Sequence, residues 1–379
     1  MSNYKTVFFT LGILLIILGI AMIVPVVFQL IYDEFDSTFI ISGIVTITFG
    51  ILFFLSNIDH LKLINTQQAF LLTALSWVSI ATFGSLPFFF SELNLSITDS
   101  FFESMSGITT TGATILKNIE SSPKGILIWR SMLQWLGGIG VILMAITLMP
   151  IMNIGGMQLL KVSSYDTSEK ILPKSREISK KLITVYIALT LLCAFFYKIF
   201  GMNTFDSLTH SMTTIATGGF SNYDQSIGYF NSAYIEVVSI LFILLGSIPF
   251  ILYIKFISDD KKIIFKDEQV KLFFKLTLVS ILVLFIYLVI VNRNIFEIQL
   301  RSVIFNVISI LTGTGYVTKE FDQWGNFPLI FFLILMFIGG CAGSTACGIK
   351  IFRLQMLLIF LKNQIKKLVS PNSVIVNKY

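Results

Sequence analysis

Three short segments of this chain consist almost entirely of threonine, glycine and alanine, and they recur at similar intervals. They read TTTG, ATGG and TGTG, and they end at Gly112, Gly219 and Gly315. A hydroxyl side chain precedes each final glycine by six residues, in the order Ser, Thr and Ser. Matching offsets in three places indicate an internal repeat with a unit of roughly 100 residues.

Such segments have the chemistry of a cation site built from oxygen atoms. Glycine permits the positive φ that turns successive carbonyls toward one axis, and threonine adds a hydroxyl on a stiff side chain. A ring of such oxygens can replace the hydration shell of a monovalent cation. A short helix ending at the segment would also direct its partial negative charge toward the ion. Alternatively, the small residues only allow close helix packing, but three matching offsets favour the cation site.

The elements that must position these segments are membrane spans. The chain has 379 residues, of which 55% are apolar and only 13% charged, and its mean hydropathy is +0.84. Soluble domains carry about 25% charged residues, so the composition argues against a water-soluble enzyme. Apolar runs of about 20 residues or more predict eight spans, at residues 6–32, 38–57, 68–91, 126–153, 182–201, 232–257, 272–292 and 328–361.

The charges between these runs predict the orientation. Six basic residues lie within 161–181 and six lysines within 255–275, whereas 201–230 has no basic residue. The positive-inside rule therefore places the lysine-rich loops and both termini in the cytoplasm. The Gly/Thr segments then enter from the external side, behind stretches too short and too polar to span. The sequence predicts an all-α integral membrane protein with two N-terminal spans and three span, pore helix, span repeats.

Four motifs resemble those of one known family. SMSGITTTGAT, MTTIATGGFSNYD, LTGTGYVTKEFDQWG and GGCAGSTACGIKIFR occur in this order. They are similar to motifs of the TrkH/TrkG/KtrB potassium-transporter superfamily, and most closely to its TrkH branch of Trk system potassium uptake proteins. The resemblance extends over almost the whole chain. It implies channel-like K⁺ uptake through a pore of four repeats with pseudo-fourfold symmetry.

The resemblance also implies which residues bind K⁺ and which gate the pore. The implied filter oxygens belong to Thr110, Thr111, Gly112, Thr217, Gly218, Gly219, Gly313, Thr314 and Gly315. Relatives that admit Na⁺ often carry serine at the first filter glycine, so Gly112 favours potassium. The fourth motif implies an intramembrane gating loop, because its glycines should interrupt the last apolar run. The implied loop residues are Gly339, Gly340, Gly343, Ser344, Thr345, Gly348 and Lys350.

Two features of the gating loop leave alternatives open. Ala346 and Cys347 stand where the family more often has serine and glycine, which could stiffen the loop. The whole segment could instead be a kinked packing helix. Lys350 is expected either to extend to the membrane interface or to meet a regulatory partner.

The repeats predict five regions. These are two N-terminal transmembrane helices in 1–60, pore repeats in 61–160, 161–260 and 261–362, and a cytoplasmic tail in 363–379. The third repeat includes the gating loop. A fourth filter at the same spacing would fall beyond Tyr379, so the sequence predicts a pseudo-fourfold pore that lacks its fourth repeat. Three explanations stay open: a truncated gene or incomplete record, a fourth repeat on a separate chain, or closure by a dimer.

The resemblance further implies the partners. K⁺ is the transported ion, and the chain is expected to lie in the lipid of the bacterial cytoplasmic membrane as a homodimer. A cytoplasmic TrkA-type nucleotide-binding subunit is expected to dock on the basic loops. The nucleotide belongs to that partner, since this chain has no P-loop or Gly-x-Gly-x-x-Gly after a strand; no organic cofactor and no nucleic acid are expected on this chain.

Two other functions stay open beside conduction. A cation-coupled secondary transporter predicts an essential carboxylate at mid-membrane, and none is evident in the apolar runs. A non-conducting truncated subunit is the second alternative. An enzyme is not predicted, because no span pairs a nucleophile with a base.

Acidic residues and one histidine lie near the predicted pore mouth. The carboxylates are Glu103, Glu120, Asp206, Asp224 and Asp322. They could concentrate cations by raising the local negative potential, or Glu103 and Asp206 could anchor the pore helices. His210 is expected to be a hydrogen-bonded structural residue, since a hard monovalent cation prefers oxygen.

Overall fold

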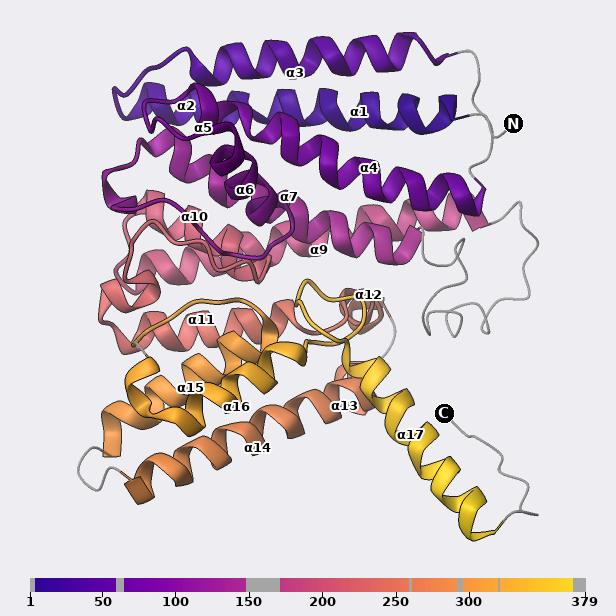
Figure 1. The fold of residues 1–379 in the computed structure, drawn as a ribbon, viewed down its shortest axis with the longest axis vertical. Helices are drawn as coiled ribbons and strands as arrows, with labels where there is room; N and C mark the ends of the chain where they lie inside the picture. The colour runs from indigo at the N-terminus through magenta and orange to yellow at the C-terminus, as the bar shows by residue number, and fades with distance from the viewer. Residues whose placement is uncertain are drawn as a thin grey trace.

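The computed structural model describes residues 4–58, 65–147, 171–258, 261–291, 296–319 and 321–370. Within these residues the chain is helical, apart from connecting loops and one isolated bridge between Ile338 and Ile349. The long helices lie side by side, and α1 begins at the end of the bundle where α17 departs (Figure 1). The predicted region boundaries near 60, 160 and 260 lie outside the described residues, and that at 362 falls inside α17 (Ile351–Val369).

Among the described residues, six helical stretches are long and apolar enough to cross a membrane. They are Lys5–Ile31, Thr38–Leu55, Thr66–Phe90, Lys124–Met144, Glu177–Ile199 and Glu268–Val291. The helices α11 (Ala233–Gly246) and α12 (Phe250–Ser258) are together long and apolar enough to cross, but they meet at 86°, as in a broken span or a re-entrant loop. The run 232–257, predicted as one span, is therefore divided by a sharp bend at Pro249. The run 328–361 is interrupted between α16 (Asn326–Phe337) and α17.

The two N-terminal spans pack closely because glycines face one another. The elements are α1 (Lys5–Ala21), α2 (Ile23–Ile31) and α3 (Thr38–Leu55). A Cβ added to Gly12 would lie 2.7 Å from the Gly50 carbonyl oxygen, and one added to Gly19 would lie 3.1 Å from that of Gly43. Small residues at a helix interface let backbones approach in a membrane.

Three units follow, each with a long apolar helix, a shorter middle helix and a closing apolar segment, which is one long helix in the first unit, a bent pair in the second and a 12-residue helix in the third. The first contains α4 (Thr66–Gly84), α5 (Leu86–Phe90), α6 (Ile97–Ile108), η2 (Ile119–Ser121) and α7 (Lys124–Thr147). The second contains α9 (Ile171–Ile199), α10 (Thr204–Ile215), η5 (Ser226–Phe230), α11 and α12. The third contains α13 (Ile263–Lys266), α14 (Glu268–Val291), α15 (Phe296–Thr312), η6 (Asp322–Trp324) and α16.

The middle helices of these units, α6, α10 and α15, each end at a Gly/Thr segment. They have 12, 12 and 17 residues, which is shorter than the roughly 20 residues needed to span the hydrocarbon core. The side chain of Ser96 accepts a hydrogen bond from the Asp99 amide at the start of α6, and Asn203 does the same for Asp206 at α10. These N-caps satisfy amides that have no partner inside the helix.

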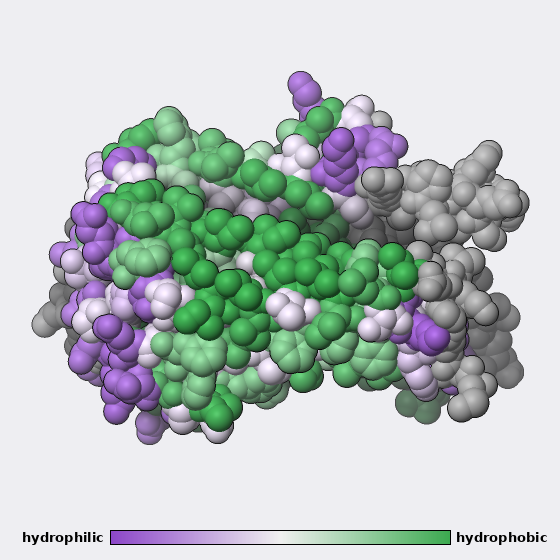
Figure 2. All heavy atoms as spheres, turned by 90° about the horizontal axis from the view of Figure 1, so that it is seen from above, coloured by the Kyte–Doolittle hydropathy of each residue, from purple (hydrophilic) through white to green (hydrophobic). Residues whose placement is uncertain are grey.

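The outer surface is apolar over a broad band. Figure 2 shows hydrophobic residues covering the middle of one face, with hydrophilic residues gathered at one end of it. Ile17 of α1 and Ile44 and Leu52 of α3 are each more than half exposed. A continuous apolar surface of this extent fits lipid tails rather than water.

Candidate ion-conduction site

The three Gly/Thr segments have the same backbone conformation. The final glycines have φ of +82° at Gly112, +81° at Gly219 and +84° at Gly315. Two residues earlier, φ is again positive in every segment: +55° at Thr110, +49° at Thr217 and +73° at Gly313. A β-branched residue rarely adopts this region. Backbone strain of this kind clusters at ligand sites, where the surrounding structure must maintain it.

Each segment is fastened to its helix by the same backbone hydrogen bonds. The amide just before the final glycine donates to a carbonyl five residues upstream, over 2.9, 2.9 and 2.8 Å in the three segments. That carbonyl belongs to the aligned hydroxyl residue. The hydroxyls of Ser106 and Ser309 also donate to the carbonyls of Ala113 and Tyr316, over 2.5 and 2.7 Å. The hydroxyl of Thr213 instead contacts that of Tyr316.

The structure brings the three segments together around one opening. A Cβ added to Gly112 would lie 2.2 Å from the Gly218 carbonyl oxygen, and one added to Gly219 would lie 1.9 Å from that of Thr314. Only glycine permits such close approach between neighbouring segments. A Cβ added to Gly315 would meet no heavy atom within 4 Å among the described residues. All three final glycines line one cavity of about 650 Å³.

A loop of residues 338–350 lies against the other side of the segments. The Cys347 amide donates to the carbonyl of Thr312 over 3.0 Å, at the end of α15. The Thr345 hydroxyl donates to that of Ile215 over 3.0 Å, at the end of α10. The Cys347 sulfur lies 3.6 Å from the carbonyl oxygen of Thr110, which follows α6. The 338–350 loop therefore contacts all three segments.

The same loop completes the bend between α11 and α12. The Gly246 carbonyl accepts from the Thr345 amide over 3.2 Å and from the Thr345 hydroxyl over 3.0 Å. On the other side of the bend, the Phe250 amide donates to the Gly343 carbonyl over 2.9 Å. Unpaired backbone groups at membrane depth are costly. The bend and the 338–350 loop therefore stabilise each other.

Lys350 folds back into the 338–350 loop. Its ammonium group donates to the carbonyl of Ala346 and, at 3.4 Å, to that of Ser344. One of the two expectations was that Lys350 extends to the membrane interface, and that expectation is wrong. A Cβ at Gly339 would lie 1.7 Å from the Cys347 carbonyl oxygen, so the loop closes on itself through a glycine.

A buried ion pair supports the first segment from behind. Glu103 of α6 and Arg130 of α7 are joined by a 2.8 Å contact, and their side chains are at most 1% exposed. Glu103 also accepts hydrogen bonds from the Thr114 hydroxyl and the Ile115 amide. The Arg130 guanidinium donates to the Ser221 carbonyl over 2.9 Å and lies over the ring of Phe220. Arg130 thus ties the first segment to the second.

The residue nine positions before each final glycine has the same task in all three units. In the first unit it is Glu103. In the second, the His210 Nε2 lies 3.0 Å from the Ser221 hydroxyl. In the third, the Asn306 amide group donates to the Lys319 carbonyl over 3.2 Å. Each of these side chains joins the pore helix to the loop segment that follows the glycine. His210 is hydrogen-bonded, as expected of a structural residue.

Gln134 and Asp206 complete this framework. The buried Gln134 side chain donates to the Gly218 carbonyl over 2.6 Å and accepts from the Phe220 amide over 3.0 Å. Asp206 accepts from the Asn222 amide group and the Tyr223 hydroxyl, each over 2.7 Å. Burial and the neighbouring Asp206 carboxylate raise the pKa of Tyr223, so its phenol stays protonated and donates.

The five carboxylates predicted near the mouth have different environments. Glu103 and Asp206 are buried anchors, as one of their two interpretations had it. Asp224 lines the opening, and Glu120 accepts a hydrogen bond from its amide over 3.2 Å. Asp322 is exposed in η6 and is not part of the lining. Within the described residues, no group of three or more His, Cys, Asp or Glu side chains is arranged to hold a metal ion.

The sequence reasoning missed Arg130 and Gln134. Both lie in the apolar run of residues 126–153, four residues apart, and therefore on one face of α7. An ionisable residue inside a membrane span indicates a functional or structural site by default. That signal was present in the sequence.

Comparison with known proteins identifies the family. The family described as TrkH, cation transport protein, matches residues 36–379. The chain belongs to this family. The Trk system potassium uptake protein TrkI of Halomonas elongata is 38% identical over 97% of this chain and 75% of that protein. TrkH of Escherichia coli K12 is 36% identical over 98% of this chain and 78% of that protein.

A solved structure agrees with this assignment. The potassium transporter TrkH from Vibrio parahaemolyticus superimposes with a TM-score of 0.91 and 33% identity, over 100% of this chain and 79% of that one. The chain thus spans about three quarters of the length of these relatives. TrkH-family proteins are potassium transporters of the membrane rather than enzymes.

Proposed function

We propose that this chain takes K⁺ up across the cytoplasmic membrane by channel-like conduction between its three Gly/Thr segments. The observation that carries this proposal is the convergence of Gly112, Gly219 and Gly315 on one cavity. The relatives are named as Trk system potassium uptake proteins, which supports K⁺ as the ion. The ion moves down its electrochemical gradient, so the protein supplies a path and a selective site.

The proposed filter consists of backbone and hydroxyl oxygens. Its residues are Thr110, Thr111, Gly112, Thr217, Gly218, Gly219, Gly313, Thr314 and Gly315. The repeated positive φ values support this assignment, because a left-handed conformation at every second residue lets successive carbonyls turn toward one axis. The carbonyl of Gly218 is shared with Gln134, so the buried amide fixes the position of this oxygen.

The proposed gate is the 338–350 loop, with Gly339, Gly340, Gly343, Ser344, Thr345, Gly348 and Lys350 as its working residues. Its contacts with the ends of α6, α10 and α15 support this role, since it lies across the inner side of the filter. The bonds of Lys350 to Ser344 and Ala346 keep the loop compact. Opening then requires these bonds to exchange partners.

The fixed carboxylates favour conduction over ion-coupled transport. A coupled transporter needs a carboxylate that binds and releases a cation at mid-membrane. Glu103 is committed to Arg130, and Glu236 lies 2.7 Å from Arg301. Asp206 accepts hydrogen bonds from three side chains, those of Asn203, Asn222 and Tyr223.

The proposal extends to orientation and partners. The lysine-rich loops face the cytoplasm, where a TrkA-type nucleotide-binding subunit docks, and the protein forms a homodimer. The common end of α1 and α17 in Figure 1 supports termini on one side. Much of the basic segment 161–181 lies outside the described residues.

Growth of a host that lacks K⁺ uptake tests the proposal. The host receives either this chain or a version extended by a fourth repeat, and growth is measured at limiting K⁺. Rescue by this chain shows that it conducts as given. If only the extended version rescues growth, this chain forms part of a pore that needs a fourth segment beside Gly315. Failure of both, with normal membrane insertion, contradicts K⁺ uptake.

A further inference from the structure

Gln134 of α7, in the first unit, holds the second Gly/Thr segment on both sides of its final glycine, Gly219. The side-chain amide group donates to the Gly218 carbonyl over 2.6 Å, and its oxygen accepts from the Phe220 amide over 3.0 Å. Because one partner is an acceptor and the other a donor, only one orientation of the Gln134 amide satisfies both. The side chain is fully buried, so water does not compete for either bond.

The segment and Gln134 are also in close steric contact. A Cβ added to Gly218 would lie 2.4 Å from both Cδ and Oε1 of Gln134. On its other side, the Gly218 carbonyl oxygen would lie 2.2 Å from a Cβ added to Gly112 in the first segment. The peptide group of Gly218 is therefore confined between Gln134 and the first segment, and a change at Gln134 should move this carbonyl.

The second segment needs this support because its own helix does not supply it. In the first and third units, the hydroxyls of Ser106 and Ser309 donate to the carbonyl just after the final glycine. The aligned hydroxyl of the second unit, that of Thr213, contacts the Tyr316 hydroxyl instead. The bonds from Gln134 thus replace a support that the other two segments obtain within their own units.

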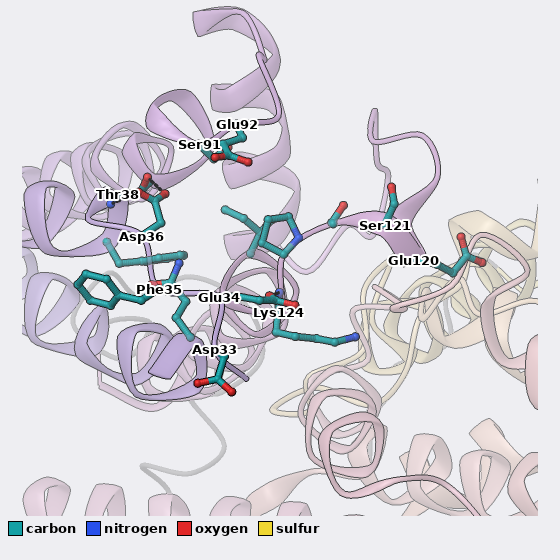
Figure 3. A pocket seen from close by; sticks show the side chains of 15 residues that line it. Asp33, Glu34, Phe35, Asp36, Thr38, Ser91, Glu92, Glu120, Ser121 and Lys124 are labelled. Atoms are coloured by element: carbon teal, nitrogen blue, oxygen red, sulfur yellow. Dashed lines mark hydrogen bonds between the residues drawn. The ribbon is translucent and has the colours of Figure 1, made fainter. Parts of the chain in front are cut away.

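The helix α7 is itself fixed in place. One turn before Gln134, the Arg130 guanidinium donates to the Ser221 carbonyl over 2.9 Å. At the start of α7, a Glu34 carboxylate oxygen accepts from the Lys124 amide over 2.7 Å, and Figure 3 shows Glu34 beside Lys124. A side chain on a rigid element holds its partner more precisely than one on a loop. Gln134 is therefore well placed to restrict the second segment.

We propose that Gln134 is a positioning residue that sets the discrimination between K⁺ and Na⁺. This inference rests on the proposed function of the three segments as a filter. Na⁺ is the smaller ion, so a ring of oxygens that suits K⁺ must contract to replace the hydration shell of Na⁺. Gln134 resists this contraction because it fixes the Gly218 carbonyl. Without its two bonds, the carbonyl turns more freely and the ring adapts to the smaller ion.

Competition for ⁸⁶Rb⁺ binding tests the proposal. The full chain in lipid nanodiscs binds ⁸⁶Rb⁺, which is displaced by K⁺ or by Na⁺, and the readout is the ratio of the Na⁺ to the K⁺ inhibition constant. Gln134→Met removes both bonds at similar volume. Gln134→Glu keeps the size and the acceptor for the Phe220 amide but loses the donor to Gly218. The ratio is expected to fall about tenfold in each variant.

Ser131→Ala is the matched control. Ser131 is a buried polar residue of the same helix, and its hydroxyl donates within α7, to the Leu127 carbonyl over 3.1 Å. This variant is expected to keep the ratio of the unaltered protein. The Tm is measured in parallel for every variant. A purely structural role of Gln134 would lower the Tm and leave the ratio unchanged.

The outcomes separate this inference from the proposed function. An unchanged ratio in the Gln134 variants, with saturable ⁸⁶Rb⁺ binding retained, overturns the inference and leaves the proposed filter standing. If Gln134→Met does not fold, Gln134→Glu decides, since it keeps the side-chain size and one of the two bonds. Lack of saturable ⁸⁶Rb⁺ binding in the unaltered protein contradicts the proposed filter, and the inference then fails with it.

Discussion

The Cys347 sulfur lies 3.6 Å from the carbonyl oxygen of Thr110, and this contact joins the 338–350 loop to the first Gly/Thr segment. The Thr110 hydroxyl is also near the sulfur, at 3.7 Å. The backbone of Cys347 is bonded to Thr312 in the third segment. One loop residue therefore holds two of the three segments, and a change there should alter how firmly the loop closes the inner side.

Cys347→Gly is expected to increase transport. The substitution removes both side-chain contacts with Thr110 while keeping the amide bond to Thr312. Loss of about 0.5–1 kcal/mol of closing energy should raise the open population and ⁸⁶Rb⁺ uptake by about two- to fivefold. Cys193→Ala, in α9 and away from the segments, is the control. Uptake at or below the unaltered level, with normal expression, contradicts a closing role for Cys347.

Gly112→Ser is expected to reduce discrimination between K⁺ and Na⁺. The new Cβ would collide with the Gly218 carbonyl at 2.2 Å and would sit at a φ of +82°. The segments must then separate, which widens the oxygen ring. Competition of Na⁺ with ⁸⁶Rb⁺ uptake measures the effect. Gly140→Ser in α7 is the control, since its Cβ meets no described atom within 4 Å. Unchanged ion preference in Gly112→Ser would refute the filter assignment.

Much of the fold could be predicted from the repeat pattern of the sequence. Matching offsets of Gly112, Gly219 and Gly315 predicted three pore helices followed by segments of one conformation, and all three φ values agree within 3°. The prediction succeeded because a positive φ favours glycine, so positions with this conformation can be recognised from the residue type alone. The glycines of the last apolar run likewise predicted its interruption.

Other features could not be predicted because they depend on contacts between distant segments. The bend at Pro249 is stabilised by Thr345 and Gly343, which satisfy backbone groups that it frees. Glu103, His210 and Asn306 each join a pore helix to the segment after its glycine. This shared role could not be recognised in the sequence, because the three side chains are chemically different. The direction of Lys350 was also not encoded locally, since its partners are carbonyls of the folded 338–350 loop.

Arg130→Met is expected to destabilise the protein strongly. It leaves Glu103 buried without its cation, and breaking a buried ion pair from one side costs about 3–5 kcal/mol. Thermal unfolding in detergent, followed by intrinsic fluorescence, should show a markedly lower Tm. Lys181→Gln, which breaks the exposed pair with Glu177, should leave the Tm unchanged. Similar Tm values for the two variants would argue against Arg130 as a structural anchor.

Lys350→Met is expected to loosen the 338–350 loop without unfolding the protein. The carbonyls of Ser344 and Ala346 lose their donor, so local opening becomes more frequent. The Gly339 amide donates to the Ile349 carbonyl and the Cys347 amide to that of Thr312. Hydrogen exchange of both amides should be about tenfold faster for a loss of about 1.4 kcal/mol. Arg353→Met, at an exposed position on α17, should exchange normally. Equal protection in both variants would show that Lys350 does not hold the loop.

The location of a bound ion tests the central claim most directly. Crystals grown with Tl⁺ in place of K⁺ report the ion through its anomalous scattering. We expect a peak on the axis between Gly112, Gly219 and Gly315, within coordinating distance of carbonyl oxygens from at least two of the three segments. Anomalous peaks found only elsewhere, with this axis empty at saturating Tl⁺, would contradict the account.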